Sequence, residues 1–156
     1  MYQKILAPLD GSEFAECSFD HVKAIAAGCQ VPEVVLLRVV EPIHASDLAA
    51  YAEAGIDTGA LMHDVESGAQ IYTAKKAEEL KKQGLPARGV VATGWAADTI
   101  MSYSEKEKVD LIIMSTHGRS GIGRWFMGSV ADKVVRHSKV PVLTVAPPGC
   151  RVGVVQ

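Results

Sequence analysis

The sequence lacks the cysteine patterns that cross-link small secreted domains or hold structural zinc. Its three cysteines, Cys17, Cys29 and Cys150, are far apart and form neither a Cys-x-x-Cys pair nor a Cys/His zinc spacing. We interpret them as buried or incidental thiols of a protein in a reducing cytoplasm. The 156-residue chain needs no cross-links, because a domain of about 150 residues buries roughly 70% of its unfolded surface. We therefore expect one domain with a full hydrophobic core.

Long hydrophobic runs and an excess of positive charge are also missing. No apolar segment approaches the length of about 20 residues that a transmembrane helix needs. The first residues, "MYQKILAPLD", do not have the layout of a signal peptide. The formal net charge is −2 and the isoelectric point is about 6.2, which argues against a protein that coats nucleic acid. We predict no membrane and no nucleic-acid partner, although a small local anion site is compatible with this charge.

Short apolar runs alternate with amphipathic segments along the chain. The runs predict buried strands over residues 5–9, 33–40, 87–93, 109–114 and 140–145. The amphipathic segments predict helices over residues 12–28, 60–83, 96–108 and 129–137, with Ser12 as the cap of the first helix and Gly28 at its end. Residues 43–59 have no clear period, and we expect a flexible, partly helical excursion there. Trp95, Ile100 and Tyr103 are candidates for the core.

This alternation is typical of an α/β protein with a doubly wound, five-stranded parallel sheet in three α/β/α layers. Such sheets bind ligands outside the carboxyl ends of their strands, where the strand order reverses. The loops after the first and fourth strands, residues 8–12 and 115–128, both lie at that end. If these two strands are neighbours, the loops flank a single crevice.

The loop after the fourth strand is rich in glycine and in hydrogen-bond donors. Gly118, Gly121, Gly123 and Gly128 let the backbone approach a ligand closely, and the loop runs into the next helix. The free N–H groups and positive dipole end of that helix favour an anion, so the physical candidate is a nucleotide polyphosphate. Arg119 and Arg124 add positive charge. The alternative interpretation is a plain surface loop followed by a ligand-free capping box over residues 129–132.

Established phosphate fingerprints do not account for this loop. The chain has no Gly-x-x-x-x-Gly-Lys-Ser/Thr sequence, and the first strand is followed by Asp10, Gly11 and Ser12, too short a turn to cradle a pyrophosphate. However, the chain resembles a single-domain universal stress protein over residues 1–146, from "KILAPLDGS" to "VPVLTV". The nucleotide motif of that family is Gly, two residues, Gly, nine residues, Gly, then Ser or Thr. Its positions here are Ser115, Gly118, Gly128 and Ser129, so Ser115 replaces the first glycine.

The resemblance implies a Rossmann-like fold of the adenine nucleotide alpha hydrolase-like kind and an ATP site, because members with the glycine motif bind ATP. Asp10 would accept hydrogen bonds from adenine or ribose, or serve only as a turn residue, and Val39 would pack on adenine or only in the core. The loop amides would wrap the ribose and phosphates, and Mg²⁺ or Mn²⁺ would bridge the phosphates, chiefly through water. The implied binding residues are Pro8, Leu9, Asp10, Val39, Met114, Ser115, Thr116, His117, Gly118, Arg119, Ser120, Gly121, Gly128, Ser129, Val130 and Ala131.

No nucleophile, base and orienting group stand at a recognisable spacing, and no residue is an evident guide for an attacking water. We interpret His117 as a loop residue, not a catalytic one, and we predict no metal site among His44, Asp47, Asp57, His63 and Asp64. The resemblance implies a cytoplasmic stress-response protein in which ATP, ADP or AMP is a regulatory ligand. It also implies a homodimer, for which the fifth strand, with Val140, Val142, Leu143 and Val145, is the expected contact. The alternatives are a nucleotide-free homodimeric interaction module and, less favoured, a slow ATPase; residues 147–156 form a tail.

Overall fold

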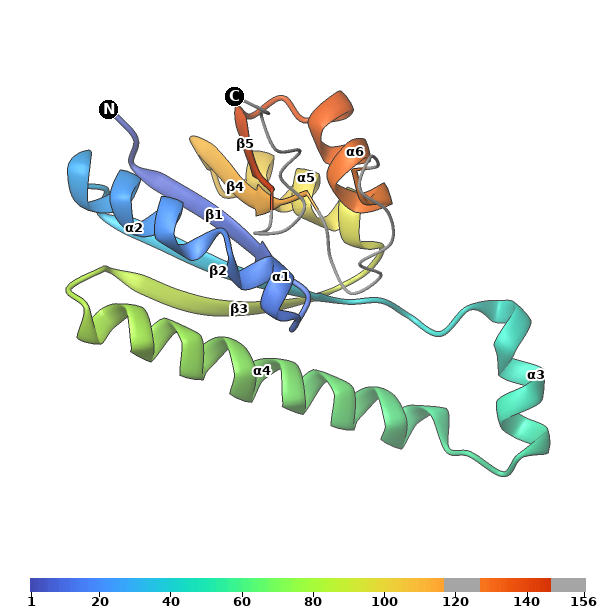
Figure 1. Cartoon of the computed structure of the whole chain (residues 1–156). Coiled ribbons are helices and arrows are strands. Elements are labelled where there is room, and N and C mark those ends of the chain that lie inside the picture. Colours follow the sequence, from blue (N-terminus) through green and yellow to red (C-terminus); the bar gives the residue numbers. More distant parts are fainter. Residues whose placement is uncertain (117–126, 147–156) are drawn as a thin grey trace, which may run out of the picture.

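Five parallel strands form the sheet in the computed structural model, which describes residues 1–116 and 127–146 (Figure 1). The strands are β1 (Lys4–Leu9), β2 (Glu33–Val40), β3 (Ala87–Thr93), β4 (Leu111–Ser115) and β5 (Val142–Val145). Their order in the sheet is β3-β2-β1-β4-β5. The central strand β1 thus pairs with β2 on one side and with β4 on the other. The first and fourth strands are therefore neighbours, as the crevice hypothesis requires.

Helices cover both faces of the sheet, and this confirms the predicted three-layer, doubly wound α/β fold. One core cluster joins α1 (Glu13–Glu16), α2 (Phe19–Gly28) and α4 (Thr58–Lys82) to one face of the strands. The other cluster joins α5 (Ala96–Lys106) and α6 (Ser129–His137) to the opposite face. The central strands alternate between the two clusters: Ile5 belongs to the first and Leu6 to the second, and both are fully buried. Their uninterrupted apolar sequence follows from this burial on both faces.

The predicted first helix is wrong in one respect, because it is broken in two at Cys17 and Ser18. Ser12 caps it as expected, with its Oγ accepting a hydrogen bond from the Ala15 amide at 3.2 Å. The fully buried Ser18 donates its hydroxyl to the Ala15 carbonyl at 2.9 Å. Such a side-chain bond competes with the helical backbone pattern. The second part ends at Gly28, as predicted, and the residue in the left-handed conformation after it is Gln30, with a φ of 52°.

The excursion after β2 is partly helical, as expected, and contains α3 (Ala45–Glu53). Figure 1 shows α3 standing away from the sheet at the far end of α4, and none of its residues is buried. Helix α4 begins at Thr58, two residues before the predicted start, because the Asp57 carboxylate accepts hydrogen bonds from the amides of Gly59 and Ala60 at 2.9 and 3.1 Å. Within the described residues, no helix combines the length and apolar character needed to cross a membrane.

Trp95 is not a core residue, contrary to the prediction, although Ile100 is buried and Tyr103 packs at the edge of the core. Trp95 is 45% exposed and lies just before α5, where its ring contacts His44 with centroids 4.7 Å apart. Glu41 lies nearby and its carboxylate accepts a hydrogen bond from the Ala96 amide at 3.0 Å. The turn into α5 thus carries the indole outward and away from the sheet.

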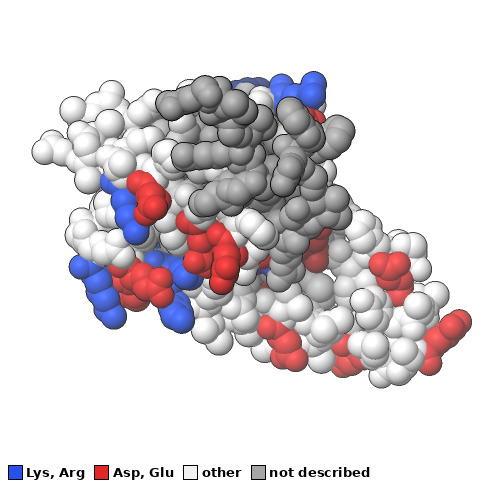
Figure 2. Space-filling model, viewed as in Figure 1, with Lys and Arg blue, Asp and Glu red and all other residues white. Residues whose placement is uncertain are grey.

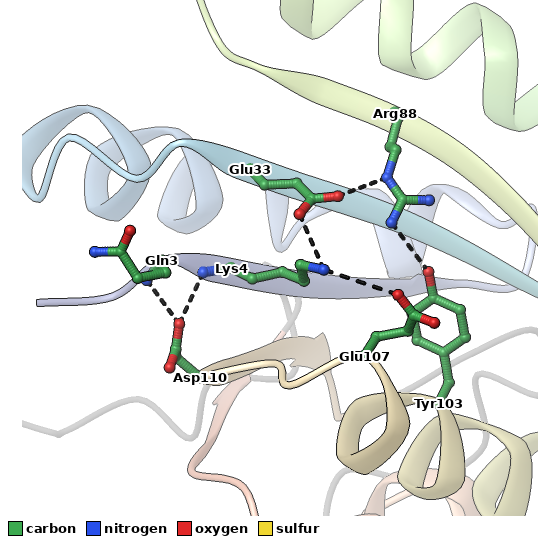
Figure 3. A network of polar contacts seen from close by, with 7 residues as sticks. All are labelled: Gln3, Lys4, Glu33, Arg88, Tyr103, Glu107 and Asp110. Carbon is green, nitrogen blue, oxygen red and sulfur yellow. Dashed lines mark hydrogen bonds and ion pairs between the residues drawn. The ribbon is translucent and has the colours of Figure 1, made fainter.

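A network of polar side chains fixes the amino-terminal ends of the strands (Figure 3). Glu33 accepts a hydrogen bond from Arg88 at 2.6 Å and pairs with Lys4 at 3.0 Å. Burial of the Glu33 carboxyl would raise its pKa, but the hydrogen bonds from Arg88 and Lys4 outweigh that effect and hold the pKa below its usual value. The network is completed by Gln3, Tyr103, Glu107 and Asp110. The network therefore lies at the opposite end of the strands from their carboxyl ends, where such sheets bind ligands.

Candidate functional site

A cavity of about 280 Å³ opens at the carboxyl ends of β1, β2 and β4, beside the beginning of α6. This is the edge at which doubly wound sheets bind ligands, because the strand order reverses between β2 and β4 around β1. The described residues that line the cavity come from three strands, three helices and the turns between them. They are Pro8, Leu9, Asp10, Ala15, Leu37, Arg38, Val39, Ala96, Ile100, Met114, Ser115, Thr116, Gly128, Ser129, Val130 and Ala131.

The turn after β1 places Asp10 at the cavity wall. Gly11 has a φ of 82°, a left-handed conformation that glycine adopts without steric cost. Within this turn, Asp10 Oδ1 accepts hydrogen bonds from the amide and the hydroxyl of Ser12, at 2.9 and 2.6 Å. Asp10 therefore acts as the turn residue that the sequence allowed, and it also lines the cavity. The Ser12 bonds hold the carboxylate in place beside any ligand.

The end of β4 directs neighbouring side chains to opposite faces of the sheet. Met114 is buried in the core cluster beneath α5 and α6. Ser115 is 7% exposed, and its Oγ accepts a hydrogen bond from the Cys17 thiol at 3.6 Å, on the α1 side. The serine hydroxyl is therefore packed against α1. This contact bears on the one position at which the chain departs from the glycine motif.

The described residues on either side of the segment between β4 and α6 lie together. The Thr116 amide donates to the Val145 carbonyl at 2.9 Å, and the Gly128 amide donates to the Thr116 carbonyl at 2.7 Å. Thr116 is thereby bonded to β5, and Gly128 is bonded to Thr116. Five of the predicted binding residues fall within the loop and lie outside the described residues: His117, Gly118, Arg119, Ser120 and Gly121.

The predicted capping box at the start of α6 is wrong. Gly128 is the N-cap and has no side chain with which to cap the helix, and Ser129 is the first helical residue. Asp132, the fourth residue of the proposed box, instead accepts a hydrogen bond from Arg136 Nε at 2.8 Å. The first amides of a helix carry partial positive charge and have no partner within the helix. Here those amides stand at the cavity wall, where an anion would satisfy them.

The described residues of the predicted set all lie around this one cavity. Pro8, Leu9 and Asp10 end β1, and Val39 lies near the end of β2 with 6% exposure. The other members are Met114, Ser115, Thr116, Gly128, Ser129, Val130 and Ala131. The structure thus brings together segments that are far apart in the sequence, from Pro8 at the end of β1 to Ala131 in α6. Whether they bind a ligand stays a prediction.

Sequence reasoning missed several residues of the cavity wall, and Arg38 is the most informative of them. It is the one charged residue inside the apolar β2 segment after Glu33, and its register partner is Leu9. Its Nη1 donates to the Leu9 carbonyl at 3.4 Å. An arginine inside a buried strand is a signal that sequence analysis could have used. Ala15, Leu37, Ala96 and Ile100 carry no such signal, because they look like ordinary core residues.

A polar group beside the cavity ties α1 to α4. Glu16 accepts hydrogen bonds from Tyr72 and from Lys76, both at 2.8 Å. Burial, followed by the hydrogen bond to Glu16, raises the pKa of the Tyr72 hydroxyl, and the Asp10 carboxylate acts in the same direction. The hydrogen bond to Glu16 also raises the pKa of the Lys76 ammonium, against the effect of burial. The first helix, which carries the Ser12 turn, is thereby fixed to the long helix.

Metal ligands do not gather in the described part of the chain. No group of three or more His, Cys, Asp or Glu side chains in residues 1–116 and 127–146 is arranged to hold a metal ion. His44 is in contact with the Trp95 ring, and His63 lies 3.9 Å from Asp64 on an exposed helix.

The fold and the cavity define a class: three-layer α/β proteins with a cavity at the carboxyl edge of a parallel sheet and a helix amino terminus in the cavity wall. Within that class, the model of the universal stress protein family matches residues 1–146, and the chain belongs to this family. Universal stress protein MJ0577 of Methanocaldococcus jannaschii is 32% identical over 155 residues, with 93% of this chain and 95% of that protein covered.

Solved structures agree with this assignment. The structure of MJ0577 superposes with a TM-score of 0.79 at 31% identity, covering 94% of this chain and 97% of that one. A universal stress protein in complex with cAMP gives a TM-score of 0.60 at 23% identity, covering 93% and 97%. A family member from Arabidopsis thaliana with AMP bound gives 0.62 at 16% identity, covering 98% and 97%. Because these two nucleotide-bound proteins are only 23% and 16% identical to this chain, they show that the fold is shared and nothing more.

Proposed function

We propose that this universal stress protein binds ATP, or ADP or AMP, as a regulatory ligand in the cavity at the carboxyl edge of the sheet. One observation carries the proposal: the N-cap of α6 is Gly128, which has no side chain to cap the helix, and the first turn of α6 opens at the cavity wall. Helix amino termini of this kind bind phosphate groups. Gly128 and Ser129, at this helix start, are also the last two positions of the family's nucleotide motif. The geometry and the motif therefore point to the same ligand.

The cavity wall suggests how the ligand lies. Val39 and Leu9 supply an apolar surface for the base, and the Asp10 carboxylate is held in place to accept hydrogen bonds from the base or ribose. Gly128, Ser129, Val130 and Ala131 stand on the opposite side, where their amides would face the phosphates. Mg²⁺ or Mn²⁺ would bind through phosphate oxygens and water. The cAMP and AMP complexes of two other proteins of this fold support an adenine nucleotide as the ligand.

Ser115 is compatible with this ligand because its hydroxyl is packed against Cys17, the residue that follows α1. A serine that pointed along the phosphate path would crowd the ligand. The contact with Cys17 instead supports placing this chain with the ATP-binding members of the family, in spite of the missing first glycine. The nucleotide-free module remains the outcome that a negative binding experiment would establish.

Bound nucleotide acts here as a regulator, and the protein is not an efficient enzyme. Ligand binding would shift the population of conformations of a partner-facing surface. Strand β5 is at one edge of the sheet, and an unpaired edge favours pairing with a second copy in a cytoplasmic homodimer. Val140, Val142 and Leu143 are half-buried at this edge, whereas Val145 lies in the core and would contribute through its backbone.

The proposal is tested by releasing and titrating nucleotide. We expect denatured, freshly purified protein to release an adenine nucleotide, and stripped protein to bind ATP with Mg²⁺ in a calorimetric titration. Gly118→Val should abolish binding without changing the melting temperature. Gly68→Val is the control, because Gly68 is exposed on α4 and a Cβ there meets nothing within 4 Å. No released nucleotide and no heat at millimolar ATP would instead establish the interaction module, and phosphate release lost in Gly118→Val would establish the ATPase.

A further inference from the structure

A two-helix projection stands apart from the rest of the molecule. We call it the arm and define it as residues 45–66, which comprise α3, the turn after it and the first turns of α4. No residue of the arm is buried, and the first buried residue along α4 is Ala69. Figure 1 shows α3 and the beginning of α4 extending beyond the carboxyl edge of the sheet. The arm thus adds two helical faces that pack against little of the chain's own core.

Apolar side chains lie on these helical faces. Leu48 of α3, Ile56 of the turn and Val65 of α4 are 45%, 43% and 43% exposed. Leu61 precedes Val65 by four residues, so the two share one face of α4. An isolated helix shorter than about 12 residues is marginal in water, and α3 has nine residues without a buried side chain. Contact with a partner would stabilise this helix.

The charge of the arm identifies the kind of partner. The arm contains five acidic residues and no lysine or arginine: Asp47, Glu53, Asp57, Asp64 and Glu66. Figure 2 shows the same pattern on the visible face of the arm, where carboxylates appear without basic side chains. Among the described residues, none of the five pairs with lysine or arginine, and their one ion pair is the 3.9 Å contact of Asp64 with His63. A basic partner would relieve the repulsion among these charges.

The place of the arm in the fold argues against a second copy as the occupant. Helix α4 packs on β2 and β3, at the opposite end of the sheet from the β5 edge where the homodimer is proposed. Several cations outside the arm, among them Lys76, Arg88 and Lys133, are moreover engaged with Glu16, Glu33 and Asp98. A basic surface supplied by another protein fits the arm better.

We propose that the arm is a docking surface for a basic amphipathic helix of another protein. The apolar side of that helix would pack on Leu48, Ile56 and Val65, in the manner of helix-in-groove recognition, and its lysines or arginines would pair with the acidic residues beside them. This interaction does not depend on nucleotide in the cavity. It gives the protein a partner surface distinct from the edge strand.

The probe for the experiment is a fluorescein-labelled synthetic helical peptide of leucine and lysine at amphipathic spacing, titrated with the full-length chain. We expect saturable binding that weakens as salt rises, and no binding of a matched leucine–glutamate peptide. Val65→Ser combined with Asp64→Asn should weaken binding about tenfold or more. The control is the double variant Val135→Ser with Asp20→Asn, which makes the same two kinds of change outside the arm. Val135 is 43% exposed, like Val65, and the Asp20 side chain is 92% exposed. This control should bind like the wild type.

Equal affinity of the arm variant and the control variant would overturn the proposal, and so would binding that is indifferent to salt. Hydrogen exchange of the wild-type chain gives a readout that does not depend on a variant: the peptide should protect the amides of α3. Binding without protection of the arm would place the peptide elsewhere and contradict the proposal. Loss of self-association in the arm variant, with peptide binding unchanged, would show that the occupant is a second copy.

Discussion

At the scale of single residues, the site depends on where short polar side chains point. Ser115 replaces a motif glycine, yet its hydroxyl accepts a hydrogen bond from Cys17 and is 7% exposed. Asp10 is fixed by two bonds from Ser12 before any ligand arrives. The sequence could identify both positions as candidates, because the motif spacing and the strand-end pattern are local. It could not tell which way the Ser115 side chain points, since that depends on Cys17, which is distant in sequence.

Ser115→Gly tests the orientation of this side chain. Because the hydroxyl is packed against α1, we expect the affinity for ATP with Mg²⁺ to change by no more than about threefold. Stability should fall slightly, since glycine within a strand has more conformational freedom in the unfolded chain. Calorimetric titration and thermal unfolding of the two proteins measure these effects. A gain of about tenfold or more in affinity would mean that the serine obstructs the ligand.

Glu33→Gln tests the polar network at the amino-terminal ends of the strands. The pKa of Glu33 is lower in the folded protein than in the unfolded chain. The carboxylate therefore stabilises the fold at pH values above its unfolded pKa, and this stabilisation is lost as the pH falls through the folded pKa. We expect the variant to be less stable than the wild type near neutral pH, with the difference shrinking as the pH is lowered below about 4. Urea unfolding across pH measures it, with the exposed Glu13→Gln as the control. A difference that stays constant with pH would refute the assignment.

At the scale of elements, the strands were predictable and the helix boundaries less so. The apolar run of β2 is bounded by Pro32 and Pro42, and both β2 and β3 have the predicted bounds. The break between α1 and α2 was not predictable, because it depends on the burial of Ser18 against the sheet. Similarly, the cap of α5 comes from Glu41, which is distant in sequence, and the displacement of Trp95 follows from that turn. Strand signals are local, whereas these details depend on packing.

The packing of α4 on β3 gives a prediction about two glycines. A Cβ at Gly89 would lie 2.8 Å from the backbone carbon of Thr73, and backbone cannot move aside easily. Gly89→Ala should therefore destabilise the protein by about 1–3 kcal/mol. Gly68→Ala, in open space on α4, should stabilise it by about 0.5–1 kcal/mol. Chemical denaturation of both variants provides the measurement, and equal effects would show that the two elements are less closely packed than described.

At the scale of the whole molecule, the parallel sheet has a cavity at its carboxyl edge, where we propose a ligand, and an edge strand, where we propose a second copy, while the arm extends beyond both. The fold class could be predicted from the alternation of strands and helices, but the strand order that makes the first and fourth strands neighbours could not. The edge that holds the cavity could be located in advance, since parallel strands end together. The arm could not, because an exposed helix leaves no regular apolar stripe in the sequence.

The central claim is that the uncapped first turn of α6 receives the phosphates of an adenine nucleotide. The most direct measurement is an amide chemical-shift titration of the ¹⁵N-labelled protein with ATP and Mg²⁺, compared with adenosine alone. We predict that the amides of Ser129, Val130 and Ala131 shift strongly with ATP and little with adenosine, while those of α2 stay unchanged. Unshifted α6 amides at saturating ATP, or equal shifts with adenosine, would contradict the account.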